Sequence, residues 1–320
     1  MARNPIQFQK GLSLIEFNRR YGTEEQCHAA LVKMRWPDGF MCPHCGGIEH
    51  SYSAARRIFQ CSACRVQTSA RAGTIFHKSR TPLVKWFLAI YLITSSKNDI
   101  AALELARQLG VKWDTAWLIK QKLMEVMRQR NATYKLGGDV QIDDAYLGGE
   151  KPGKVGRGAG NKVPFVIAVA TRKNKPIYTR LRCVPGLTKE AIKTYAEANI
   201  APGARVVSDG LGCFGGLADA GLKHKALVTG SGRPKDERLK WANIGLGNIK
   251  SAITGTCRSF DPQHTERYLA SYEWRFNRRF DLDKTSIVSP ALPRKLRLLP
   301  TNRSQQFILE RRYRGNQEGR

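Results

Sequence analysis

Residues 140–149 read Val140-Gln141-Ile142-Asp143-Asp144-Ala145-Tyr146-Leu147-Gly148-Gly149. Apolar and polar residues alternate from Val140 to Asp143, which predicts a strand with Gln141, Asp143 and Ala145 on one face. Val140 and Ile142 would share the other face. A carboxylate is costly on such a strand unless it is used, although many aspartates near strand ends are simply solvated. Whether Asp143 belongs to an active site therefore depends on the rest of the chain.

The charge of the chain points to a polyanionic partner. Lys and Arg number 54 against 26 acidic residues, which gives a formal net charge of +28 over 320 residues. The excess recurs from end to end, and such a surface favours tight, salt-sensitive binding to nucleic acid. A ribosome-like solubility charge and a membrane-surface protein are the alternatives. The length allows two or three domains.

We expect an intracellular protein with no membrane partner. The start of the chain lacks the apolar segment of a signal peptide. The longest apolar run, residues 83–93, is interrupted by Lys85 and is shorter than the roughly 20 residues of a membrane span.

Four cysteines form two Cys-x-x-Cys pairs separated by a 15-residue interval. The pairs are Cys42 with Cys45 and Cys61 with Cys64. This spacing is typical of a structural Zn²⁺ site with four thiolate ligands, in which the interval forms a small β-hairpin. A redox pair or four unrelated thiols would not explain why both pairs occur together.

The segments on either side of the cysteines are predicted to be helical. Thr23 and Gln26 have the spacing of a capping box, and Thr81-Pro82 marks another helix start. Further on, helices over residues 99–108 and 114–130 are separated by a turn at Gly110, which is the pattern of a helix-turn-helix. Any helical hairpin can have such a turn, but basic residues expected on the outside favour DNA binding, among them Lys112, Lys120 and Lys122.

The remainder of the chain has the element order of an RNase H-like domain. Strands are expected at 140–147, 163–170, 176–184, 204–210 and around 227–228, with helices from Thr188, over 241–250 and near the end. This order predicts a mixed five-stranded sheet with helices on both faces. A glycine-rich basic loop at 150–162 contains Lys154 and Arg157 and is a candidate contact for a nucleic-acid backbone, though a solvated loop fits nearly as well.

Two aspartates would meet in this sheet. Asp143 is on the first strand and Asp209 ends the fourth, and these strands are neighbours in that fold. Carboxylates on adjacent strands suit Mg²⁺, and two such ions can activate an attacking oxygen and stabilise a leaving one in phosphodiester chemistry. The helix after the fifth strand has no acid and offers only Asn243 and Asn248.

The whole order of motifs resembles the bacterial insertion-sequence transposases that join an N-terminal zinc ribbon to a DDE-type catalytic domain. The resembling segments are Trp36-Pro37-Asp38-Gly39, the cysteine pairs, the helix-turn-helix, residues 142–149, Val207-Ser208-Asp209-Gly210 and Arg275-Phe276-Asn277-Arg278-Arg279. The resemblance implies the following domains: a helical segment (1–39), a zinc ribbon (40–77), a helix-turn-helix region (78–134), an RNase H-like catalytic domain (135–285) and a basic tail (286–320).

The resemblance also assigns the catalytic residues. Asp143 and Asp209 match the first two acids of the family, whereas Asp144 falls where the family often has an acid that is not a ligand. The third acid stands seven residues before a helical lysine, and counting back from Lys250 reaches Asn243. An amide oxygen can bind a metal but adds no charge. Asn248 is the second choice for this position, with Glu237 and Glu266 as acidic outsiders; Lys250 itself could contact a phosphate.

The implied function is a DNA transposase that uses Mg²⁺ or Mn²⁺ to cut the ends of an element and join them to target DNA. Its partners would be the terminal inverted repeats and target DNA, and bringing two ends together would need a dimer or larger assembly in the bacterial cytoplasm, at the nucleoid. Two alternatives stay open. The first is a DNA-binding regulator derived from a transposase, inactive because the third acid is missing, and the second is an RNase H-like nuclease without strand transfer.

Overall fold

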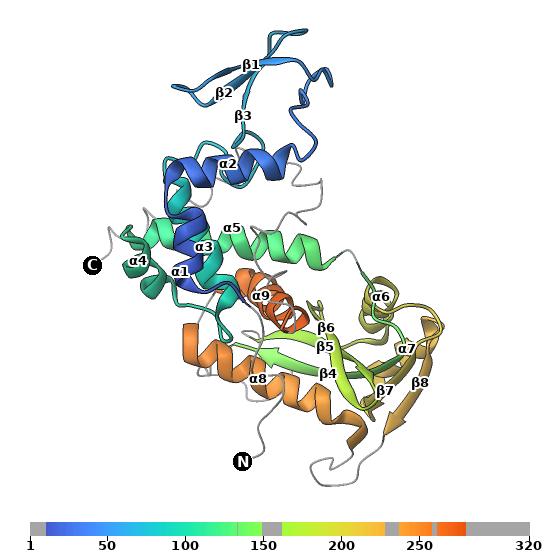
Figure 1. Ribbon diagram of the computed structural model, residues 1–320. Helices are drawn as coiled ribbons and strands as arrows, with labels where there is room; N and C mark the ends of the chain where they lie inside the picture. Colours follow the sequence, from blue (N-terminus) through green and yellow to red (C-terminus); the bar gives the residue numbers. More distant parts are fainter. Residues whose placement is uncertain (1–10, 133, 149–161, 228–236, 258–260, 280–320) are drawn as a thin grey trace, which may run out of the picture. The chain divides into compact units, whose positions relative to one another are not determined.

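The computed structural model describes residues 11–132, 134–148, 162–227, 237–257 and 261–279 (Figure 1). Most of these residues fall into two compact units, an N-terminal unit of residues 13–88 and a C-terminal unit that begins at Ala89. The expected basic tail at 286–320 and the expected basic loop lie outside the described residues, apart from Lys162 at the end of that loop.

The N-terminal unit starts with two capped helices. In α1 (Leu14–Tyr21) the Ser13 side chain accepts a hydrogen bond from the backbone N–H of Glu16. In α2 (Glu24–Arg35) Thr23 and Gln26 form the expected capping box, because each side chain accepts from the other residue's backbone N–H. The local sequence therefore determines where both helices begin.

A three-stranded antiparallel sheet follows in the order β1 (His50–Ser53), β2 (Ile58–Cys61) and β3 (Gln67–Ser69). The first two strands form the hairpin that was expected between the cysteine pairs. Glu24 ties this region to the next helix, since its carboxylate pairs with Arg71 at 2.6 Å and accepts from the backbone N–H of Val84 at 3.2 Å. That helix, α3 (Leu83–Ser95), begins directly after Thr81-Pro82, as predicted.

The helix, glycine turn and helix are also present, as α4 (Ala102–Leu109) and α5 (Trp113–Asn131). Gly110 has a φ of 58° and a ψ of 51°, a left-handed conformation that a side chain would strain. Its N–H caps the end of α4. Ala116, Ile119 and Leu123 are buried along α5, which gives it the inner face that the sequence predicted.

The large five-stranded sheet has the order β6-β5-β4-β7-β8. Its strands are β4 (Asp139–Leu147), β5 (Val163–Arg172), β6 (Lys175–Cys183), β7 (Arg205–Asp209) and β8 (Lys223–Leu227). The first three form an antiparallel meander, whereas β7 and β8 run parallel to β4. This mixed order confirms the RNase H-like prediction.

Helices cover both faces of this sheet (Figure 1). One face buries Val140 and Ile142 of β4 against α6 (Lys189–Asn199) and α7 (Gly216–Asp219), with the short 3₁₀ turn Gly212–Gly215 beside them. The other face buries Ala145 of β4 against α8 (Lys240–Cys257) and α9 (Thr265–Asn277). The alternation predicted for β4 is thus observed, and it directs Gln141 and Asp143 toward the face that α8 covers.

Candidate metal sites

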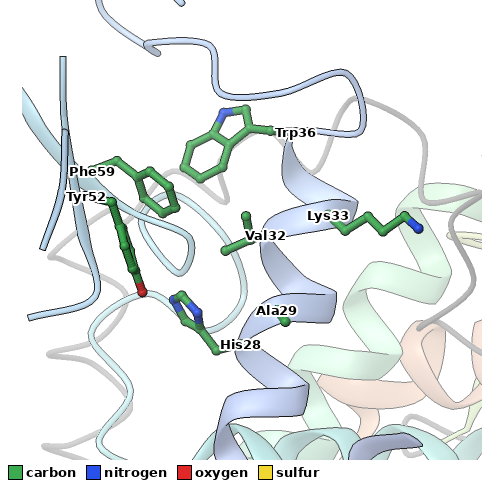
Figure 2. A pocket seen from close by; sticks show the side chains of 7 residues that line it. All are labelled: His28, Ala29, Val32, Lys33, Trp36, Tyr52 and Phe59. Carbon is green, nitrogen blue, oxygen red and sulfur yellow. The ribbon is translucent and has the colours of Figure 1, made fainter. Parts of the chain in front are cut away.

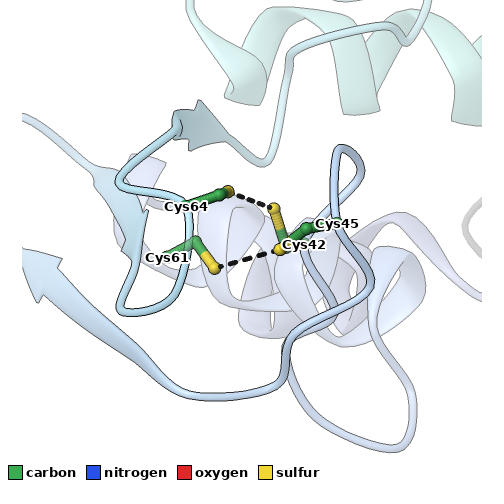
Figure 3. Close-up of side chains that lie close together, drawn as sticks. All are labelled: Cys42, Cys45, Cys61 and Cys64. Carbon is green, nitrogen blue, oxygen red and sulfur yellow. Dashed lines mark hydrogen bonds between the residues drawn. The ribbon is translucent and has the colours of Figure 1, made fainter.

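The four predicted zinc ligands converge in the N-terminal unit (Figure 3). The Sγ atoms of Cys42 and Cys64 lie 3.6 Å apart, as do those of Cys45 and Cys61. These distances are far longer than the roughly 2.0 Å of a disulfide bond. They match the edge of about 3.8 Å that a tetrahedron of sulfurs 2.3 Å from a central Zn²⁺ would have. The donor set therefore fits a structural zinc ion.

Backbone geometry prepares these thiolates. The N–H of Gly46 donates to the carbonyl of Cys42, and the N–H of Arg65 donates to the carbonyl of Cys61, both at 3.0 Å. The two cysteine pairs thus sit on equivalent turns, with Gly46 and Arg65 at positive φ. The backbone N–H groups of Cys45 and His44 lower the pKa of the Cys42 thiol to about 6, which favours the thiolate that a metal needs.

A separate hollow of about 430 Å³ lies between α2 and the small sheet (Figure 2). Its walls are mostly apolar and aromatic, with Trp36, Phe59 and Tyr52 among them and Lys33 as a cationic member. Of the side chains that line it, only His28 is of a metal-ligating type, and His28 belongs to neither group of potential metal ligands found among the described residues.

The second cluster is formed by carboxylates at the centre of the large sheet. β4 and β7 pair in parallel with Gln141 opposite Val207, and continuing this register puts Asp143 beside Asp209. One carboxylate oxygen from each of Asp143, Asp144 and Asp209 lies within 4.8 Å of the others. The two predicted aspartates are therefore brought together. Asp144, set aside on the family resemblance, joins them.

Within this cluster, Asp143 has a carboxyl pKa that is raised well above its ordinary value. Burial is the main cause that raises the pKa of its carboxyl to about 7, and the negative charges of Asp209 and Asp144 add to it. The backbone N–H of Asp144, which donates to Asp143 at 2.8 Å, and the charge of Lys250 act in the opposite direction. Three crowded carboxylates that repel one another fit a divalent cation, which would remove this repulsion.

The two candidate asparagines of α8 lie on different sides of the helix. Asn243 and Lys250 are seven residues apart and so share one flank, whereas Asn248 lies about 140° around the helix from Asn243. Because the charge of Lys250 acts on Asp143, the flank with Asn243 is the one that faces the acids. The side chain of Asn248 instead hydrogen-bonds the hydroxyl of Tyr272 on α9. This arrangement favours Asn243 over Asn248 as a metal ligand.

Of the two acidic outsiders, only Glu266 has a described side chain. Glu266 accepts from the backbone N–H of Cys183 at 2.8 Å and pairs with Arg182 at 3.6 Å, at the end of β6. Glu266 does not join the group of acids that meets around Asp143. The backbone of Glu237 begins the short turn before α8, but its side chain lies outside the described residues.

One predicted DNA contact is wrong. Lys120 was expected outside, but its side chain is only 1% exposed. Its Nζ lies 3.1 Å from Asp99 and donates to the carbonyl of Ile100 at 2.6 Å. Residue periodicity placed α5 correctly but could not show that the buried side chain of Asp99, in the loop between α3 and α4, would pair with this lysine.

The other basic candidates differ in position. Lys112, just before α5, and Lys250 are exposed, and Lys122 is half-buried, where burial lowers its pKa. Lys154 and Arg157 lie outside the described residues.

Comparison with known families decides the assignment. The family described as "ISXO2-like transposase domain" matches residues 135–277, and the "Transposase zinc-ribbon domain" matches residues 22–67. The chain therefore carries a transposase zinc ribbon followed by a transposase domain, which is consistent with an insertion-sequence transposase.

A relative and two solved structures are also similar. The relative is an uncharacterized protein in the transposable element ISH50 of Halobacterium salinarum, 28% identical over 142 residues. That match spans 43% of this chain and only 46% of the relative. The catalytic core of BIV integrase is 15% identical with a TM-score of 0.27, covering 42% of this chain and 81% of that one. The Mos1 strand transfer complex is 12% identical with a TM-score of 0.22, covering 62% and 78%.

No helix in the described part of the chain is both long enough and apolar enough to cross a membrane.

Proposed function

We propose that the chain is a DNA transposase that cuts the ends of its insertion sequence and joins the freed 3′ hydroxyls to target DNA by in-line transesterification. The observation that carries the proposal is the meeting of Asp143 and Asp209 on adjacent strands, beside the flank of α8 that bears Asn243 and Lys250. The match to the transposase domain covers all four residues.

The residues fit a magnesium or manganese site. Asp143 and Asp209 would hold the cations, and the amide oxygen of Asn243 would be a further ligand. Bound divalent cations supply activation of the attacking oxygen and stabilisation of the leaving oxygen in such chemistry. The ammonium group of Lys250, whose charge acts on Asp143, would neutralise a nearby phosphate. The raised pKa of Asp143 keeps a proton on its carboxyl below about pH 7 until a cation replaces it.

DNA binding is assigned to the basic surface and to the two small modules. Lys112 and Lys122 on the helix-turn-helix, with Lys154 and Arg157, would contact phosphates of the terminal repeats and of the target DNA. The zinc ribbon would dock DNA or a partner. Since two ends must be joined in one event, we propose a dimer or larger assembly.

Strand transfer by the full-length protein tests this function. Oligonucleotides with the ends that flank the coding region are incubated with target DNA and Mg²⁺. We expect Asp143→Asn to abolish joining. Asp139→Asn is the matched control on the same strand, because Asp139 is exposed and pairs only with the exposed Arg205 among the described contacts. Joining that persists in Asp143→Asn would overturn the proposal.

The amide at position 243 favours one alternative, a DNA-binding regulator derived from a transposase. It would bind the same ends without cutting in Mg²⁺ or Mn²⁺, and Asn243→Glu would then be expected to produce cleavage. A nuclease without strand transfer would cut the ends but leave the products unjoined.

A further inference from the structure

A side chain of the central strand caps the helix that lies beside the acids. Gln141 lies on β4 two residues before Asp143, on the same face, and its side chain is buried at 6% exposure. Its Oε1 accepts hydrogen bonds from the backbone N–H of Trp241 at 2.8 Å and from that of Ala242 at 3.2 Å. Both donors belong to the first turn of α8.

These two bonds satisfy a real need. The first four N–H groups of an α-helix have no partner within the helix, and burying such a group without a partner is destabilising. In most helices a residue just before the first turn supplies the acceptor. Here the acceptor comes from a residue a hundred positions earlier in the chain. The cap therefore also joins α8 to β4.

These two hydrogen bonds between Gln141 and α8 lie close to the candidate catalytic residues. On the strand they lie two residues from Asp143, and on the helix they lie next to Asn243. The path from one proposed ligand to the other thus runs through a single side chain. Additional contacts restrict the same turn, since the indole N–H of Trp241 donates to the carbonyl of Asn174 at 3.0 Å.

The close packing at Gly245 fixes a different feature of the position of α8. Gly245 lies so close to the sheet that an added Cβ would be 2.6 Å from the Cδ1 atom of Ile167. That contact fixes how near the helix comes to β5. It does not fix how far the first turn is shifted along the helix axis, whereas hydrogen bonds to two successive N–H groups do.

We infer that Gln141 is a positioning residue whose side-chain oxygen holds the first turn of α8 on β4, so that the amide of Asn243 faces the carboxylates of Asp143 and Asp209. The inference rests on the proposed function for its metal, but its own test does not need DNA. A neutral acceptor suits the place, because it makes both bonds without adding a fourth negative charge next to three carboxylates.

A double-mutant cycle on Mn²⁺ binding tests the role. Free Mn²⁺ is titrated by electron paramagnetic resonance against the zinc-loaded full-length protein. Gln141→Met keeps the length of the side chain and removes the acceptor. We expect it to weaken Mn²⁺ binding by about tenfold in the otherwise native chain, as loss of a residue that orients a ligand does. In the Asn243→Ala background, where there is no ligand left to orient, we expect less than about a twofold further loss.

A merely structural cap would give a different pattern. If Gln141→Met weakens Mn²⁺ binding equally in both backgrounds, or in neither, the inference is overturned. A native chain that binds no Mn²⁺, or an Asn243→Ala variant that binds it normally, overturns it too. Gln141→Asn, which withdraws the oxygen by one methylene, is run through the same cycle and replaces Gln141→Met should that variant fail to fold.

The conservative variant Gln141→Glu supplies the rescue arm. Its carboxylate can accept from both N–H groups, so we expect it to bind Mn²⁺ at least as tightly as the native chain. Binding as weak as that of Gln141→Met would contradict the inference. Absence of strand transfer with an intact Mn²⁺ cycle would reject the proposed function alone, and the converse result would reject only the role of Gln141.

Discussion

Two lysines of helix α5 and its cap, Lys120 and Lys112, are expected to respond to substitution in opposite ways. Lys120 is 1% exposed, and its partner Asp99 is 7% exposed. Removing one member of a buried ion pair typically costs about 3–5 kcal/mol, because the other charge is left uncompensated. In Lys120→Met, Asp99 would keep Arg275 at 3.7 Å as a partial counter-charge. We therefore expect the lower end, about 3 kcal/mol, which is roughly 6–12 °C in Tm for a unit of this size.

Lys112 provides the matched comparison, since it is exposed at the start of the same helix. Lys112→Gln should leave the melting temperature unchanged. It should reduce the slope of log K for DNA binding against log salt by about 0.9, the contribution of one phosphate contact. Lys120→Met should leave that slope unchanged at a temperature where it is folded. Calorimetry and binding titrations at several salt concentrations measure both quantities. A shallower salt slope in Lys120→Met, with no loss of stability, would refute the burial argument.

Further expectations concern the zinc site, the acids and the glycines. Cys61→Ser should remove the bound Zn²⁺ seen by elemental analysis and unfold the small sheet, since the metal supplies much of a ribbon's folding energy; one Zn²⁺ retained per chain would count against the site. The pKa of Asp143 is raised to about 7 in the metal-free fold, so the folded chain holds the proton of this carboxyl more tightly than the unfolded chain does. The contribution of Asp143 to the free energy of unfolding should therefore decline as pH rises from about 4 to 7. That decline should vanish in Asp143→Asn, and Mn²⁺ affinity should rise over the same range. Gly216→Ala should destabilise the fold strongly, because the added Cβ would lie 2.2 Å from the carbonyl oxygen of Lys189. Gly255 has open space around it, so Gly255→Ala should stabilise α8 by about 0.5–1 kcal/mol. Thermal unfolding of both variants measures the two effects.

Local patterns were enough to predict the elements and most of the candidate metal ligands. The cysteine spacing, the capping box at Thr23 and the alternation around Asp143 each depend on neighbours within a few residues. The order of the strands and helices along the chain then limits the sheet to a few topologies. The burial of Lys120 could not be predicted in this way, because it depends on Asp99 and Arg275, which the fold brings together. The same holds for the bond from Gln141 to α8.

The place of Asp144 changes how the missing third acid should be understood. From the sequence, an asparagine at position 243 leaves the site with two ligand charges where the family resemblance implies three. The structure puts the carboxylate of Asp144 within the same 4.8 Å cluster as those of Asp143 and Asp209. When all three are ionised they carry three negative charges, the number that a triad of acids would supply. Cation affinity depends on the total charge around the ion as well as on the number of oxygen ligands. Asn243 can therefore serve as an oxygen donor while Asp144 supplies the charge, and a weak cation site does not follow from the amide alone.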